Sequence, residues 1–92
     1  MQLIMNQIYP GCWQVRCDDV AELFGKEQEA EDYYVRLHNR NSGDYWIIKG
    51  HGNWHVVDIA RDRVRGVPYM TLAGAVYNVN KFRTSGVDDV RD

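Results

Sequence analysis

Apolar side chains recur at every second residue along much of the chain and follow a helical period near its end. Residues 3–8 are predicted to form a short strand, which the turn sequence at residues 9–11 closes. Residues 12–17 predict a second short strand, in which Cys12 and Cys17 lie on opposite faces because side chains alternate along a strand.

A short helix is predicted after this second strand. Asp18 or Asp19 is a suitable N-cap, because its carboxylate can accept hydrogen bonds from the free N–H groups of a first helical turn. The helix would run for about two turns through the apolar residues Val20, Ala21, Leu23 and Phe24 and end at Gly25, which tolerates the left-handed conformation of a C-cap. Residues 26–32 form an acidic stretch that is either a loop or a continuation of the helix.

Three strands are predicted in the middle of the chain, at residues 33–38, 45–49 and 53–59. Turn-forming residues separate them at positions 41–44 and 50–53, and both segments contain residues that tolerate a positive φ. The three strands are therefore expected to form an antiparallel meander.

The clearest helix in the sequence follows Thr71, its predicted N-cap. Before this helix, residues 61–66 are predicted to form a polar turn. Residues 63–67 are alternatively predicted to pair as an edge strand that ends at Pro68. Residues 85–92 are expected to be a flexible polar tail. The helix is predicted from an apolar stripe on a 3.6-residue period, which consists of Leu72, Ala75, Val76, Val79 and Phe82.

These elements predict one α+β domain over residues 1–92. Its antiparallel sheet of three to five strands packs against the C-terminal amphipathic helix, and a short helix lies near the N-terminus. A length of 92 residues with 45% apolar and 26% charged side chains is typical of one globular domain. Two cysteines are too few for a disulfide scaffold, and residues 1–8 resemble neither a signal peptide nor a membrane span. We therefore expect a cytoplasmic protein without membrane contact.

The predicted meander has two different faces. The face beneath the C-terminal helix is expected to carry Val35, Leu37, Trp46, Ile48, Trp54 and Val56. The opposite face mixes aromatic, cationic and imidazole groups, and its candidate binding residues are Tyr34, Arg36, His38, Tyr45, Lys49 and His55. Such a face can stack bases on its rings and hold phosphates with its cations, as single-stranded nucleic acid requires. The alternative is an ordinary solvated sheet face that another segment partly covers.

Charge divides the chain into an acidic and a basic part, although the net charge is only −2. Residues 1–34 contain two basic and seven acidic side chains, a net −5, and residues 35–83 contain eight basic and three acidic ones, a net +5. A protein polarised in this way can attract partners of either sign.

Each charged part supplies a candidate binding surface. Seven acidic residues are candidates for docking on a basic protein surface in place of phosphates, namely Asp18, Asp19, Glu22, Glu27, Glu29, Glu31 and Asp32. Three basic residues of the predicted edge strand and its turn are candidates for contacting phosphates or a partner, namely Arg61, Arg63 and Arg65. The alternative is that the side chains of both sets are simply solvated at the surface and bind no partner. Ion pairs between such exposed side chains contribute only about 0 to 1 kcal/mol each to stability.

No pattern in the sequence indicates an enzyme, a metal or a cofactor. Cys12 and Cys17 together with His51 and His55 are the residue types of a zinc site, but the gap between the cysteines and the histidines far exceeds that of a compact zinc finger. A small hydrolase that uses a metal or His38 with the other two histidines is the weakest hypothesis, because no signature supports it.

A compact chain with divided charge, 12% aromatic residues and no catalytic signature is similar in general character to the small accessory proteins with which bacteriophages block host machinery, CRISPR inhibitors among them. This resemblance concerns only size and general composition, and it assigns no role to any residue of this chain. It implies a non-enzymatic binding protein that inhibits or modulates a host protein or ribonucleoprotein complex that handles nucleic acid. The alternative hypothesis is a single-stranded nucleic-acid-binding module that uses the basic and aromatic face.

Overall fold

The computed structural model of the chain describes residues 2–85, which form six strands and two helices. The chain divides into two compact units, Met1–Asn41 (unit 1) and Ser42–Asp92 (unit 2). Each unit has the same element order of three strands followed by one helix, and its strands form an antiparallel meander. The α+β class, the antiparallel pairing and the C-terminal helix are confirmed. The strands belong, however, to two three-stranded sheets.

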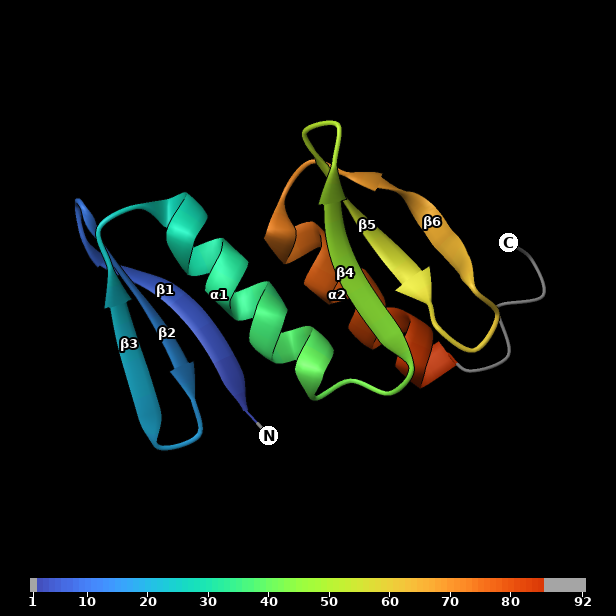
Figure 1. The fold of residues 1–92 in the computed structure, drawn as a ribbon, viewed down its shortest axis with the longest axis horizontal. Helices are drawn as coiled ribbons and strands as arrows, with labels where there is room; N and C mark the ends of the chain where they lie inside the picture. Colours follow the sequence, from blue (N-terminus) through green and yellow to red (C-terminus); the bar gives the residue numbers. More distant parts are fainter. Residues whose placement is uncertain (1, 86–92) are drawn as a thin grey trace. The chain divides into compact units, whose positions relative to one another are not determined.

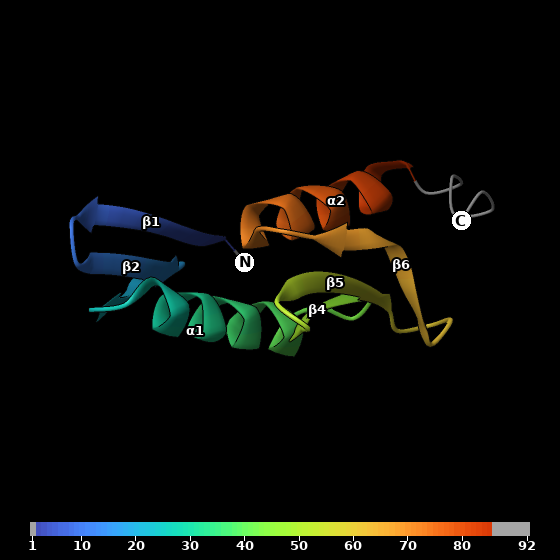
Figure 2. The same cartoon turned by 90° about the horizontal axis from the view of Figure 1, so that it is seen from above.

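Unit 1 contains β1 (Leu3–Tyr9), β2 (Cys12–Cys17), β3 (Val20–Phe24) and α1 (Glu27–Arg40). β2 is the central strand, so β1 and β3 are the two edges of the sheet (Figure 1). α1 lies along one face of this sheet (Figure 2). The side chain of Val15 in β2 and those of Ala30 and Tyr34 in α1 are buried, so the core of unit 1 lies between its central strand and its helix.

Unit 2 contains β4 (Tyr45–Gly50), β5 (Asn53–Asp58), β6 (Arg63–Tyr69) and α2 (Leu72–Ser85). β5 is central, and α2 lies along one face of the sheet (Figures 1 and 2). The pairing of β5 with β6 is interrupted by an irregularity next to Gly66, whose φ of 79° is typical of the glycine in a β-bulge. The buried side chains of Ile47, Val56 and Val79 form the centre of the core.

The predicted N-terminal helix is wrong, because residues 20–24 form β3. Asp18 has a φ of 54°, and together with Asp19 it makes a two-residue turn across which Cys17 pairs with Val20. Aspartate tolerates the left-handed backbone region better than most residues. The residue that was predicted to cap a helix therefore closes a β-hairpin, and the apolar run after it pairs with β2.

The predicted strand at residues 33–38 is also wrong, because this segment is the second half of α1. The acidic stretch before it is helical from Glu27 onward, so α1 continues through both segments. Buried side chains recur at Ala30, Tyr34 and His38, which is the spacing of one helix face. Acidic residues in the first turn and basic residues in the last turn also favour this helix, because they complement its dipole.

A two-residue turn sets the register of the second sheet. His51 and Gly52 have φ values of 54° and 80°, and they pair Gly50 directly with Asn53. Positive φ at both central residues is the geometry of the tight turns that match the twist of a hairpin. The residues of β4 are consequently paired one position away from the predicted register.

This register exchanges the two faces of β4. Ile47 lies opposite Val56, and both side chains are 0% exposed. The predicted core residues Trp46 and Ile48 are instead 45% and 44% exposed, since a one-residue slip moves every side chain of a strand to the other face. Trp54, in contrast, is buried as predicted.

The predictions for the C-terminal part are largely confirmed. The Thr71 hydroxyl accepts a hydrogen bond of 3.1 Å from the backbone N–H of Gly74, and Leu72, Ala75 and Val79 of the apolar stripe are buried. The edge strand is present as β6, but it extends past Pro68 to Tyr69, so the proline does not end it. Of the predicted tail, residues 86–92 lie outside the described residues.

Asp44 and Arg83 tie the start of β4 to the end of α2. Two hydrogen bonds join them, Arg83 Nε to Asp44 Oδ2 at 2.9 Å and an Arg83 terminal nitrogen to Asp44 Oδ1 at 2.8 Å. The hydrogen-bonded Arg83 guanidinium is the main reason why the pKa of the Asp44 carboxyl falls from 3.8 to about 2. Hydrogen bonds from Ser42 and the Tyr45 backbone lower this pKa further, although partial burial opposes the shift. The pair therefore favours the ionised carboxylate in the folded state.

We expect this ion pair to make a small, pH-dependent contribution to stability. The pKa of Asp44 is lower in the folded state than in the unfolded state, so the contribution is complete above about pH 4 and is lost as the pH falls towards 2. Because both side chains are partly exposed, Asp44→Asn should lower the free energy of unfolding by no more than about 1 kcal/mol at neutral pH. Urea denaturation at pH 7 and at about pH 2 measures this, with the exposed Asp62→Asn as control. An equal deficit of Asp44→Asn at both pH values would contradict it.

Neither helix that lies between residues 2 and 85 combines the length and the apolar character needed to cross a membrane.

Candidate functional site

The predicted basic and aromatic face does not form one surface of a sheet. Tyr34, Arg36 and His38 lie on α1 in unit 1. The remaining members lie in unit 2, namely Tyr45, Lys49, His55, Arg61, Arg63 and Arg65. A single sheet face that could stack bases along three strands is therefore absent from residues 2–85, because its first strand is a helix.

Burial removes several of these side chains from any binding surface. Tyr34, His38 and Tyr45 are buried, and burial raises the pKa of the Tyr34 phenol. Arg65, predicted on an exposed edge, is only 2% exposed. Its Nη1 donates a 2.7 Å hydrogen bond to the Tyr45 hydroxyl, and its guanidinium carbon lies 4.4 Å from the centre of the Phe82 ring.

Three further members make contacts within unit 2. The Nζ of Lys49 lies 5.1 Å from the ring centre of Trp54, and Nε2 of the half-buried His55 lies 3.1 Å from the Gly50 carbonyl oxygen. Arg61 forms a 3.2 Å ion pair with the buried Asp58. Arg36 and Arg63 are exposed. The cations of unit 2 therefore belong in large part to its own packing.

The seven acidic candidates, in contrast, all lie in unit 1. This unit contains seven acidic and four basic side chains, a net charge of −3. Six of the seven are exposed, and the exception is the half-buried Glu31. Asp18 and Asp19 form the turn before β3, and Glu22 lies within β3. The other four lie on the first two turns of α1. The acidic side chains thus surround β3 and the start of α1.

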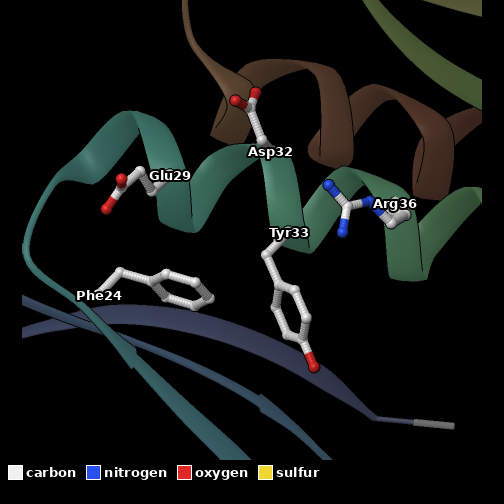
Figure 3. Close-up of a pocket in the computed structure, with 5 residues that line it drawn as sticks. All are labelled: Phe24, Glu29, Asp32, Tyr33 and Arg36. Carbon is white, nitrogen blue, oxygen red and sulfur yellow. The ribbon is translucent and has the colours of Figure 1, made fainter.

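An open pocket of about 340 Å³ lies where the end of β3 meets α1. Phe24 and Tyr33 provide its apolar part, with ring centres 5.2 Å apart and a tilt of 47°. Glu29, Asp32 and Arg36 line the rest and project from successive turns of the helix (Figure 3). The pocket therefore combines two aromatic rings with two carboxylates and one guanidinium.

A second open pocket, of about 420 Å³, lies on the other side of Tyr33. Its apolar lining comes from Cys17, Val20, Tyr33 and Leu37, and the carboxylates of the Asp18–Asp19 turn complete it. Tyr33 is shared by both pockets, one at the Phe24 end of β3 and the other at its Val20 end. We call the two pockets together the Tyr33 groove; it follows β3 along its border with α1.

The edge of β3 is open and apolar. Val20 and Leu23 are 58% and 60% exposed. β3 pairs with β2 without a register shift over its five residues, whereas β1, at the other edge of the sheet, has an irregularity after Gln7. A regular, exposed and apolar edge strand is a ready template for pairing with another chain, and proteins usually disrupt such edges.

The groove contains groups that are suited to recognition. Carboxylates can attract cations, and the aromatic and aliphatic walls can bury apolar stems. Cys12 and Cys17 both have free thiols, and Cys12 is buried. Among residues 2–85 no group of three or more histidine, cysteine or acidic side chains is arranged to hold a metal ion.

Comparison with known proteins identifies no relative: no family model, no curated protein and no solved structure matches the chain.

The apolar lining of the Tyr33 groove was not predicted as part of a site. The sequence pattern predicts a helix at Phe24 and a strand at Tyr33 and Leu37. A helical pattern that includes Ala30, Tyr33 and Leu37 is present in the sequence and would have identified the helix. The pairing of Phe24 with Tyr33 depends on β3 and has no local signal.

Proposed function

We propose that the chain is a non-enzymatic binding protein that modulates a nucleic-acid-handling protein or ribonucleoprotein of its host. In this proposal the Tyr33 groove and its acidic surroundings dock on a basic surface of the partner. The partner then loses access to phosphates, because carboxylates occupy the cations that would bind them.

The observation that supports this proposal best is the combination of open groove and charge in unit 1. Exposed carboxylates attract a basic partner over a distance but contribute little affinity by themselves. Half-buried aromatic rings add the apolar contact that tight interfaces need. The groove has both, since Phe24 and Tyr33 line the same pocket as the acidic residues Glu29 and Asp32.

Charge reversal inside and outside the groove tests the proposal. Glu29 and Glu27 are both exposed and both lie in the first turn of α1, but only Glu29 lines the groove. Glu29→Lys and Glu27→Lys therefore change the net charge and the helix dipole interaction equally. We expect the wild type to capture a nucleic-acid-binding protein from bacterial lysate, Glu29→Lys to reduce its recovery at least about tenfold, and Glu27→Lys to leave it nearly unchanged.

The captured protein, once purified, should release a labelled oligonucleotide when the wild-type chain is added. The chain itself should not bind single-stranded or duplex oligonucleotides at about 50 mM salt, where phosphate contacts are strong. Equal recovery by the wild type and Glu29→Lys would refute docking through the groove. Direct, salt-sensitive oligonucleotide binding would favour the alternative function as a nucleic-acid-binding module, whose predicted sheet face is not formed.

A further inference from the structure

We infer that the partner supplies an extended basic segment, which adds to unit 1 as a fourth strand along β3. This inference rests on the proposed function and specifies how the docking takes place. The segment would pair with the open edge of β3 and direct every second side chain into the Tyr33 groove. The first support is the position of the groove, which lies between a helix and the edge strand of its own sheet.

The backbone of β3 supplies the first half of the contact. In an antiparallel sheet every second residue of an edge strand directs its N–H and C=O away from its neighbour. β3 pairs with β2 alone and does so regularly over its whole length, so these groups form an even row. An added strand can pair with such a row through main-chain hydrogen bonds, which supply affinity without regard to sequence.

The two pockets supply the second half. Alternate side chains of an added strand point to the same face and are spaced by about 7 Å per two residues. The five residues of β3 thus allow two or three such side chains to face α1. Tyr33 separates the two pockets and would lie between successive inserted side chains.

The lining of each pocket indicates which side chains fit. At the Phe24 end, a lysine or arginine can lay its aliphatic stem against the rings and place its charge near Glu29. At the Val20 end, the walls of Cys17, Val20 and Leu37 favour an apolar side chain or another long stem. A segment whose groove-facing, alternate residues are lysine or arginine satisfies both pockets, because a long aliphatic stem fits at either end.

The defined probe is a synthetic peptide of about seven residues in which lysine and valine alternate, long enough to span β3. Two further versions carry N-methyl groups, one on every lysine amide and one on every valine amide. Alternate amides of a strand face opposite edges, so each version blocks one edge only. Binding to the full chain is measured by fluorescence anisotropy at low salt, and an alternating glutamate and valine peptide is the control for charge.

Strand addition predicts that one methylated version binds at least about tenfold more weakly than the parent peptide, whereas the other retains its affinity within about threefold. Glu29→Lys should weaken the parent peptide by about tenfold, and Glu27→Lys should not. If both methylated versions bind like the parent, the peptide binds by charge alone; strand addition is then refuted and the proposed function stands. If the parent peptide fails to bind while capture from lysate still depends on Glu29, strand addition is likewise refuted.

Discussion

Ile47→Ala is expected to destabilise unit 2 by about 2 to 5 kcal/mol, the range for truncating a fully buried isoleucine. Ile47 lies opposite Val56 at the centre of the β4–β5 pairing, and neither side chain is exposed. Removing its side chain leaves a cavity against Val56 and the buried face of α2, because a packed core relaxes only in part. Urea denaturation followed by the fluorescence of the buried Trp54 measures the loss.

Trp46→Ala is the matched control for this substitution. Trp46 is the neighbour of Ile47 in β4 and is much larger, but its side chain is 45% exposed on the opposite face. Its indole N–H donates one hydrogen bond of 3.2 Å to the Ser42 carbonyl oxygen, so a cost of about 1 kcal/mol is expected. If Trp46→Ala costs more than Ile47→Ala, β4 has the register that the sequence pattern suggested.

Arg65→Ala is expected to cost about 2 to 4 kcal/mol, although it removes a charged residue. The guanidinium is buried beside Phe82 and donates a hydrogen bond to the Tyr45 hydroxyl. The alanine variant loses this packing and also leaves a buried hydroxyl without its donor, which costs about 1 to 3 kcal/mol by itself. The free energy of unfolding by urea measures the effect.

Arg63→Ala provides the control on the same strand, and its exposed side chain should contribute less than about 0.5 kcal/mol. Tyr45→Phe completes a double-mutant cycle with Arg65→Ala. A coupling of roughly 1 kcal/mol or more between the two substitutions would be the signature of the hydrogen bond. Equal effects of Arg65→Ala and Arg63→Ala would mean that Arg65 is solvated, as the sequence pattern had suggested.

Elements with one dominant local pattern were predictable from the sequence. The helix after Thr71 has both a capping residue and an apolar stripe on a helical period, and it begins where these signals place it. The strands β2, β4 and β5 follow from turn residues on either side of short apolar runs. In each of these elements the local propensity and the tertiary packing favour the same structure.

The errors arose where two signals compete. Residues 33–38 contain tyrosine and valine, which favour strands, but the same segment places Tyr34 and His38 on one helical face. Asp18 is suited both to an N-cap and to a left-handed turn, and pairing of the next residues with β2 decides between them. Such decisions depend on contacts with other segments, which a local pattern does not contain.

The register of β4 shows a different limit. Its four consecutive apolar residues, Tyr45 to Ile48, fit either face of a strand equally well. Only the geometry of the His51–Gly52 turn fixes which of them lies opposite Val56. Reading that dipeptide as a two-residue turn would have given the observed pairing from the sequence.

The acidic residues of the candidate site were predictable from the sequence, but the groove that they surround was not. All seven acidic residues were identified from the sequence, and all lie in unit 1. The groove beside them requires Phe24 from β3 and Tyr33 from α1 to approach each other, and both elements were assigned to other structures. The same errors produced a nucleic-acid-binding face whose members lie in two different units.

Hydrogen exchange of the β3 backbone tests the central claim most directly. Amide exchange is recorded by NMR for the full chain, alone and with the alternating lysine and valine peptide. We expect exchange to slow at alternate residues of β3, whose N–H groups are free at the edge of the sheet and become bonded to the peptide. Unchanged exchange along β3 at a saturating peptide concentration, with slowed exchange in the strands of unit 2 instead, would contradict the account.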